Sequence, residues 1–263
     1  MSLAAAVTLK RDESLDEFVQ RCHMIGFVGT VVSGVLLIYD LGRPMRFLNM
    51  LRVFRPTSPM NMGAWILSAT GGTAFVTVAL RRHRGVVGAI GEMFGMVSGI
   101  FGLGLATYTG VLVANTAVPV WQASRRALPA LFGSSAVASL GCAFDAFGLK
   151  TPANAFGIIG RSAELVAGFC MEREASGVPR VGRPLKRGLS GVMFRTSTLL
   201  TAVSLALALW PNATRKRKMV SGVLGSLGSL LMRFSVEAAG KASARDSRAS
   251  FQRQRQALQE AGS

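Results

Sequence analysis

Apolar stretches long enough to cross a membrane alternate with short polar segments along most of this chain. A transmembrane helix needs about 20 mostly apolar residues, because each residue adds about 1.5 Å and the hydrocarbon core is about 30 Å thick. Seven stretches approach or exceed this length, at 18–39, 63–80, 92–118, 128–149, 152–171, 188–210 and 219–236. The pattern therefore predicts an all-α fold, a polytopic transmembrane helix bundle of about seven spans.

The domain organisation follows from the same pattern. Residues 1–240 are expected to form one transmembrane helical bundle, and residues 241–263 a polar, basic C-terminal tail rich in Gln and Arg. Small residues recur every fourth position at Gly91, Gly95 and Gly99, and again at Ser221, Gly225 and Ser229. Such stripes let neighbouring membrane helices approach closely, so both predict helix packing.

Composition and charge agree with a membrane protein. Half of the 263 residues are apolar and 16% are charged, whereas about 25% are charged in an ordinary soluble domain. The net charge of +17 comes from Lys and Arg in nearly every loop between spans, so membrane topology accounts for it and nucleic-acid binding is not expected. The loops on the C-terminal side carry more Lys and Arg, which favours a cytoplasmic C-terminus.

Cysteine and histidine placement argues against a resident metal centre. Cys22, Cys142 and Cys170 lie in or beside apolar stretches without the Cys-x-x-Cys spacing of zinc or iron–sulfur sites. His23 lies near the start of a span and His83 lies in a basic cluster, so neither suits axial haem ligation at membrane depth. No metal ligands and no cofactor held covalently or by metal ligands are expected.

Charged residues inside spans are candidates for function, because each costs about 2.5–3.5 kcal/mol on insertion scales. Arg161 and Glu164 are three residues apart, share a helix face and are expected to neutralise each other. The pair is either a structural ion pair or part of a proton-conducting quinone or water pocket. Asp145 is expected at the membrane interface, and Arg195 either reaches the interface or pairs with Asp145 or Glu164.

Polar groups also follow one side of the third span. Tyr108 and Asn115 are seven residues apart and are therefore expected to point the same way. They could donate hydrogen bonds to a quinone carbonyl, or they could simply hydrogen-bond between helices.

Two polar blocks carry the most specific motifs. The first, at 40–65, combines four arginines and three prolines with a Met-, Asn- and Trp-rich end; the second, at 106–121, reads Ala-Thr-Tyr-Thr-Gly-Val-Leu-Val-Ala-Asn-Thr-Ala-Val-Pro-Val-Trp. Together with Glu164-Leu165, 171–173, Arg233-Phe234 and 242–246, these blocks resemble the NrfD/polysulfide-reductase membrane-anchor family. The resemblance covers most of residues 24–246.

The resemblance implies an integral subunit of a multi-subunit oxidoreductase that exchanges electrons with menaquinone or ubiquinone as an exchangeable substrate. It implies an iron–sulfur ferredoxin-like partner and a molybdopterin-containing catalytic subunit. It also implies a multi-pass protein of the prokaryotic inner membrane that takes part in anaerobic respiration. No catalytic centre is expected in this chain itself. The candidates for quinone binding and proton transfer are Asp40, Arg43, Asn49, Tyr108, Asn115, Arg161 and Glu164.

The sequence departs from the family in two places. Family members usually have eight or more spans, and the span expected to be missing here is an N-terminal glycine-rich helix. The tail after Asp246 also lacks the usual Pro-Lys-Tyr-Thr ending. The alternative function is therefore a non-catalytic anchor or assembly subunit of the same fold, without a working quinone site. A transporter is less favoured, because the chain shows no inverted repeat.

Overall fold

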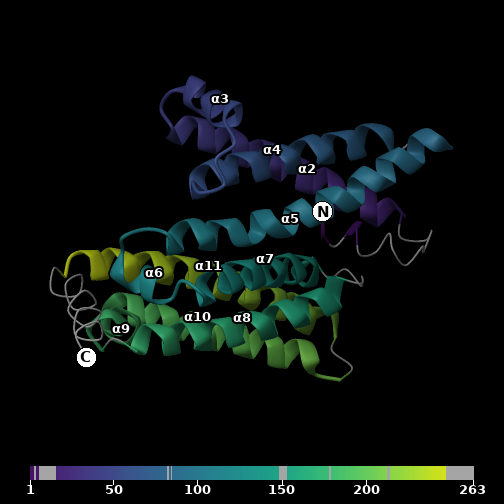
Figure 1. Cartoon of the computed structure of the whole chain (residues 1–263). Coiled ribbons are helices and arrows are strands. Elements are labelled where there is room, and N and C mark those ends of the chain that lie inside the picture. Colours follow the sequence, from purple (N-terminus) through teal and green to yellow (C-terminus); the bar gives the residue numbers. More distant parts are fainter. Residues whose placement is uncertain are drawn as a thin grey trace. The chain divides into compact units, whose positions relative to one another are not determined.

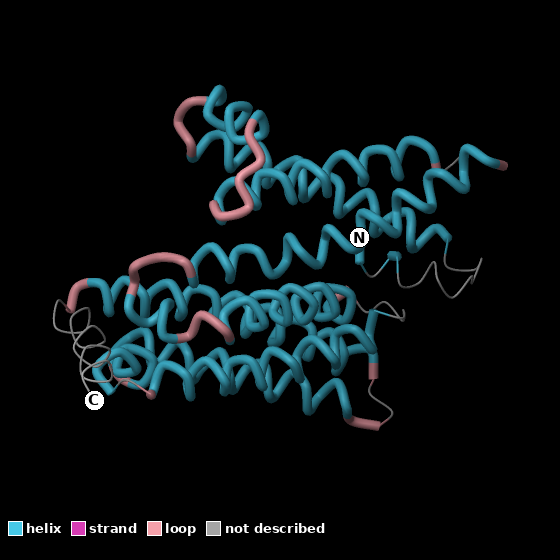
Figure 2. Tube along the Cα trace, in the orientation of Figure 1, coloured by secondary structure: helices cyan, strands magenta, loops and turns pink. Residues whose placement is uncertain are grey.

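The structure is a computed structural model that describes residues 1–2, 4–5, 16–81, 83, 85–147, 153–177, 179–211 and 214–246. Within this described part the chain forms ten helices and no strand (Figures 1 and 2). The helices are α2 (Asp16–Asp40), α3 (Pro44–Arg52), α4 (Pro59–Leu80), α5 (Val86–Ala114), α6 (Pro119–Ala123), α7 (Ala127–Ala146), α8 (Ala153–Ser176), α9 (Pro179–Lys186), α10 (Gly188–Leu209) and α11 (Arg215–Ala244). The expected all-α class is confirmed.

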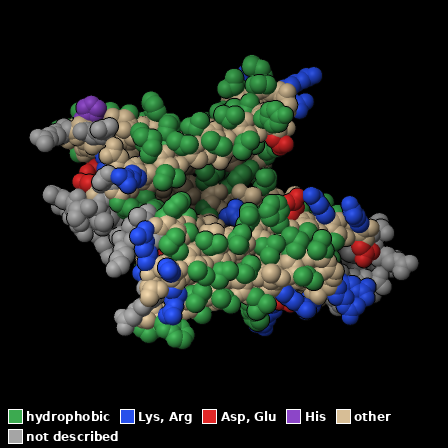
Figure 3. All heavy atoms as spheres, turned by 180° about the vertical axis from the view of Figure 1, so that it is seen from behind, with side chains coloured by type: hydrophobic (Ala, Val, Ile, Leu, Met, Phe, Trp, Pro, Cys, Tyr) green, Lys and Arg blue, Asp and Glu red, His purple; other side chains and the backbone are tan. Residues whose placement is uncertain are grey.

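Six of these helices are long and apolar enough to cross a membrane, judged by length and composition in the described part of the chain. They are α2, α4, α5, α7, α10 and α11. The remaining expected span, at 152–171, corresponds to α8, which has 24 residues but carries Arg161 and Glu164 in its middle. Broad hydrophobic areas cover the helices on the face drawn in Figure 3, as a surface in contact with lipid requires.

Two segments whose charges and prolines predict loops contain short helices. In the first, Pro44 occupies the first turn of α3, after an extended Arg43. Proline suits this position, because its fixed φ matches the helix and its missing N–H has no partner there anyway. The second short helix is α9, in the basic segment before α10. The third span is also shorter at its end than expected, since α5 stops at Ala114 and Pro119 begins α6.

The chain divides into two compact units, residues 1–108 and residues 109–263, each described here by itself. The expected single bundle over 1–240 stays a prediction. Helix α11 continues to Ala244, so the first four residues of the expected tail are helical. From residue 247 onward the tail lies outside the described residues.

In the first unit, α2 packs along α4, and the glycine stripe of α5 makes close contacts. A Cβ added at Gly95 would lie 3.2 Å from His23 Nε2 and 3.2 Å from Thr77 Cγ2. A Cβ added at Gly99 would lie 2.6 Å from Ala5 Cβ. The stripe therefore serves close packing, as its spacing predicts.

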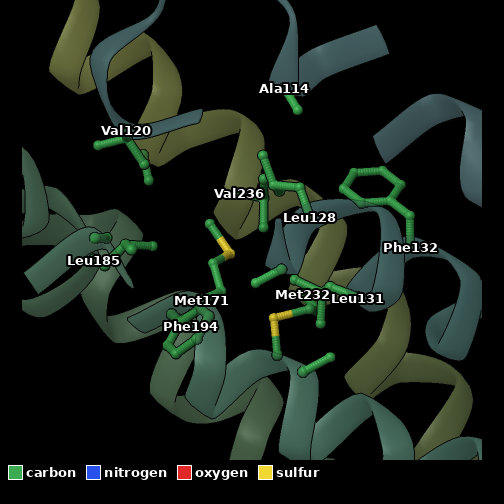
Figure 4. Packing of buried hydrophobic residues seen from close by; sticks show 14 of the residues in the cluster. Ala114, Val120, Leu128, Leu131, Phe132, Met171, Leu185, Phe194, Met232 and Val236 are labelled. Atoms are coloured by element: carbon green, nitrogen blue, oxygen red, sulfur yellow. The ribbon is translucent and has the colours of Figure 1, made fainter. Parts of the chain in front are cut away.

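In the second unit, α7, α8, α10 and α11 form a four-helix bundle (Figure 1). Its apolar core lies toward one end, where Met171, Phe194 and Met232 from α8, α10 and α11 converge beside Leu131 of α7 (Figure 4). Each of these four side chains is buried.

The other end of this bundle is held by small residues. A Cβ added at Gly222 of α11 would collide with the backbone of α7, at the Ala146 nitrogen and the Cys142 oxygen. One added at Gly228 would lie 2.6 Å from Thr201 Oγ1 of α10. The backbone of α11 thus approaches both neighbours closely, and the polar groups described below can reach across the gap between helices.

We predict that Gly222→Ala destabilises the protein by about 1–3 kcal/mol, because the methyl group meets backbone that cannot move aside locally. The matched control is Gly72→Ala in α4, where an added Cβ meets nothing within 4 Å. The control is expected to be neutral or to gain about 0.5–1 kcal/mol of helix stability. The check is denaturant unfolding of both variants in detergent, and equal stabilities would contradict the close approach of α11 to α7.

Candidate functional site

The first three candidate residues lie on the surface of the segment that follows α2. Asp40 is the last residue of α2, Arg43 precedes α3, and Asn49 lies within α3; all three side chains are exposed. Helix α3 has no buried residue. These side chains therefore do not line an enclosed pocket within their own unit.

Asn61, which was not among the residues expected to act, holds this segment in place. Its side-chain nitrogen donates to the carbonyl oxygens of Met50 at 2.6 Å and Val53 at 2.9 Å. Its side-chain oxygen accepts from the backbone N–H of Arg55 at 2.8 Å. Asn61 is 7% exposed, so one buried amide satisfies three backbone groups where α3 ends and the chain turns into α4.

The contact between Gly63 and Tyr108 joins the two polar blocks. A Cβ at Gly63 would overlap the Tyr108 ring, so the ring lies directly on the backbone of α4 and a larger residue at position 63 would have to displace it. The Tyr108 side chain is partly buried. Its hydroxyl makes no hydrogen bond to any residue that the structure describes, which leaves a donor and an acceptor free beside the backbone of Gly63.

Asn115 is engaged at its own helix end. It follows the last residue of α5, is exposed, and donates from its side-chain nitrogen to the Val111 oxygen at 2.8 Å. This bond satisfies one of the carbonyl groups that a helix C-terminus leaves without a partner. The expectation that Tyr108 and Asn115 act as a pair stays a prediction, since they belong to different units.

Arg161 lies at the centre of a buried polar cluster in the second unit. It is 0% exposed and uses all three guanidinium nitrogens. Nη2 donates to Asp145 Oδ2 at 2.7 Å, and Nη1 donates to the hydroxyls of Ser204 and Ser221 at 2.9 Å each. Nε donates to the Gly157 oxygen at 2.9 Å. The side chain thereby connects α8 with α7, α10 and α11.

The partner of Arg161 differs from the expected one. The ion pair joins Arg161 to Asp145 on α7 rather than to Glu164 on its own helix. Asp145 is accordingly buried, at 4% exposed, and not at the membrane interface. The physical reason is close helix approach: a Cβ added at Gly157 would lie 3.0 Å from the Cα of Gly141 on α7. Arg161 therefore reaches the neighbouring helix more easily than the next turn of α8.

Arg195 lies apart from both of the partners considered for it, Asp145 and Glu164. It is exposed, and its Nη2 donates to the Lys186 oxygen at 3.3 Å, which places it at the helix end and away from Asp145 and Glu164.

Glu164 has its own environment, one turn further along α8. It is 0% exposed, and its Oε2 accepts from Ser229 Oγ of α11 at 2.8 Å. Its other oxygen has no hydrogen-bond partner among the described residues. Arg233 lies close by; its Nε donates to Ser135 Oγ at 3.5 Å, and its guanidinium lies over the Phe132 ring. Glu164 is thus a buried carboxyl group with free hydrogen-bonding capacity.

A groove of about 730 Å³ runs along α7 and α8. It is mostly apolar, carries the hydroxyls of Ser134 and Ser162, and has Arg126 and Glu174 in its lining. None of the seven candidate residues lines it. Its size falls within the range of ordinary ligand pockets.

The described part of the chain contains no group of three or more His, Cys, Asp or Glu side chains that could hold a metal ion. The candidate residues therefore fall into three places: the exposed segment at 40–49, the Gly63–Tyr108 contact, and the buried polar clusters around Arg161 and Glu164. Asn115 bonds the end of its own helix and is not part of these groups.

Comparison with known proteins adds one finding. A family model described as polysulfide reductase, of the NrfD type, matches residues 3–154. The match includes Asn61, Gly63, Tyr108 and Asp145, and it ends before Arg161 and Glu164. No curated protein matches the chain.

We predict that Asn61→Asp loosens the segment between α3 and α4. The carboxylate keeps the bond from Arg55 but loses both donors, which leaves two carbonyl groups without partners at about 1–3 kcal/mol each where they are buried. Hydrogen exchange of residues 50–58 should accelerate, as measured by mass spectrometry. The matched control is Asn49→Asp at an exposed position, and equal exchange in both variants would show that Asn61 does not hold the segment.

Proposed function

We propose that this chain, which belongs to the NrfD-type polysulfide reductase family, is the subunit through which a multi-subunit oxidoreductase exchanges electrons with the membrane quinone pool. The chain is a multi-pass membrane protein, with six helices long and apolar enough to span a bilayer in its described part. In this proposal it works in the prokaryotic inner membrane. A ferredoxin-like iron–sulfur subunit docks on it, and a molybdopterin subunit carries the terminal reaction.

The observation that carries the proposal is the Gly63–Tyr108 contact. Both residues lie within the family match and within one compact unit, yet they come from different motif blocks. The phenol is fixed against the helix backbone, partly buried, and has no hydrogen bond among the described residues. A hydroxyl held in this way at the end of an apolar helix suits the carbonyl oxygen of a quinone.

The quinone would be menaquinone or ubiquinone as a substrate, and the chain would hold no cofactor of its own. Reduction takes two electrons from the iron–sulfur partner and two protons from the protein or water, and it leaves a quinol. In this proposal Tyr108 donates a hydrogen bond to one carbonyl of the quinone. Asp40 and Arg43 are exposed, so the Asp40 carboxylate is available for proton exchange with water and both side chains for contact with the partner.

A second candidate function is a membrane anchor without a working quinone site. It is favoured by the way two of the remaining candidates are used: Asn115 bonds its own helix end, and all three guanidinium nitrogens of Arg161 are bonded within the bundle. In this alternative the chain still holds the iron–sulfur partner in the membrane, and electrons reach quinone elsewhere in the complex.

The test is photolabelling of the full chain in nanodiscs with a photoreactive quinone analogue, mapped by mass spectrometry. Labelling around residues 61–65 and 104–112 that unlabelled quinone displaces is the expected result. Tyr108→Phe should weaken binding roughly 2- to 12-fold, the value of one hydrogen bond of about 0.5–1.5 kcal/mol. The matched control is Tyr39→Phe, since the chain has two tyrosines and Tyr39 is 85% exposed.

Displaceable labelling confined to the α7–α8 groove would contradict the assignment to Tyr108. A chain that binds its iron–sulfur partner but shows no displaceable labelling at all would select the anchor function instead.

A further inference from the structure

A basic pocket lies where α9, α10 and the end of α11 meet, all within the second unit. Its volume is about 500 Å³. Arg183 and Arg187 line it from the α9–α10 side, and Lys241 and Arg245 line it from the end of α11. Asp246 is the acidic residue in the lining. Four cationic side chains thus share one small cavity.

The cations outnumber the acids even when neighbouring carboxylates are included. Lys241 Nζ lies 2.7 Å from Glu237 Oε1, in an exposed pair on one face of α11. With Asp246 and Glu237 both counted against the four cations, the surroundings of the pocket remain positive. The pocket therefore favours an anionic ligand.

The beginning of α10 adds to this preference. Gly188 has a φ of 75° and starts α10, and Arg187 before it provides no side-chain cap. Gly188, Leu189 and Ser190 all line the pocket. The first N–H groups of a helix lack partners within the helix and carry partial positive charge, which an anion stabilises.

Arg183 and Arg187 also border a second hollow. It measures about 290 Å³ and includes Lys186 and Ser176. The two arginines therefore border both hollows, and their guanidinium groups can each donate paired hydrogen bonds to a phosphate.

The apolar part of the lining distinguishes a lipid from a small free anion. Pro184, Leu189, Ala238 and Ala242 line the same pocket, and the Leu189 side chain is 76% exposed. The pocket lies at the first residues of α10, a candidate membrane span, and therefore at the depth of the lipid headgroups. An amphiphile with a negative headgroup matches both the charge and the apolar surface.

We propose that this pocket binds the phosphate headgroup of an anionic phospholipid. Arg183, Arg187, Lys241 and Arg245 hold the phosphate, while the glycerol and the start of an acyl chain lie over Leu189. Because none of these residues contributes to the Tyr108 contact, this site does not depend on the proposed exchange with quinone.

The experiment measures lipid binding to the full chain in detergent by native mass spectrometry. Phosphatidylglycerol is titrated against phosphatidylcholine, and inorganic phosphate is added in a separate arm. Phosphatidylglycerol should bind with clear preference, and inorganic phosphate at millimolar concentration should not displace it. The double variant Arg183→Gln/Arg187→Gln should lower the affinity roughly 30-fold, because each cation near the surface contributes about 1 kcal/mol.

The matched control is Arg215→Gln/Lys216→Gln, which removes two exposed cations from the opposite end of α11 and should change the affinity less than twofold. If the Arg183→Gln/Arg187→Gln variant does not fold, the second pair Lys241→Gln/Arg245→Gln tests the same pocket from the side of α11. Equal binding of both lipids, or equal losses in the test and control variants, would overturn the proposal. Displacement by inorganic phosphate would assign the pocket to a free anion instead.

Discussion

The ion pair between Arg161 and Asp145 is the interaction on which the second unit depends. A charge buried in a membrane bundle must be neutralised, because the surrounding lipid and apolar side chains cannot solvate it. Arg161 meets this constraint with a carboxylate of α7, hydroxyls of α10 and α11, and a carbonyl of α8. Four helices must therefore approach closely at one level, and small residues along α7, α8 and α11 make that possible. The bonds also explain how α8 stays inside the bundle despite its charges.

Some polar side chains of the molecule have a structural role, and others have hydrogen-bonding atoms available for chemistry. All three guanidinium nitrogens of Arg161 and both side-chain donors of Asn61 are bonded within the chain, so both are best understood as structural groups. Tyr108 and Glu164 differ, because each has a hydrogen-bonding atom without a partner among the described residues. The free groups are the ones that a substrate or a proton could use. Tyr108 also lies within the family match, whereas Glu164 lies beyond it.

Much of the fold was predictable, because span length and apolar composition depend only on the sequence and on membrane thickness. The short helices α3 and α9 were missed, since each lies in a segment whose charges and prolines indicate a loop. The partner of Arg161 was also missed. Spacing along one helix brings Glu164 within reach, but the packing of α7 against α8 decides which carboxylate is nearer. The roles of Asn61 and Gly63 needed the structure as well, because both involve residues distant in sequence.

A double-mutant cycle on Arg161 and Asp145 tests the central claim most directly. Unfolding free energies of the full chain in mixed detergent would be compared for Arg161→Met, Asp145→Leu and the double variant. Each single variant leaves one buried charge without its ionic partner and should cost about 3–5 kcal/mol. The double variant should cost clearly less than their sum, with a coupling of about 0.5–3 kcal/mol. Additive effects, or single variants as stable as the original chain, would contradict the account.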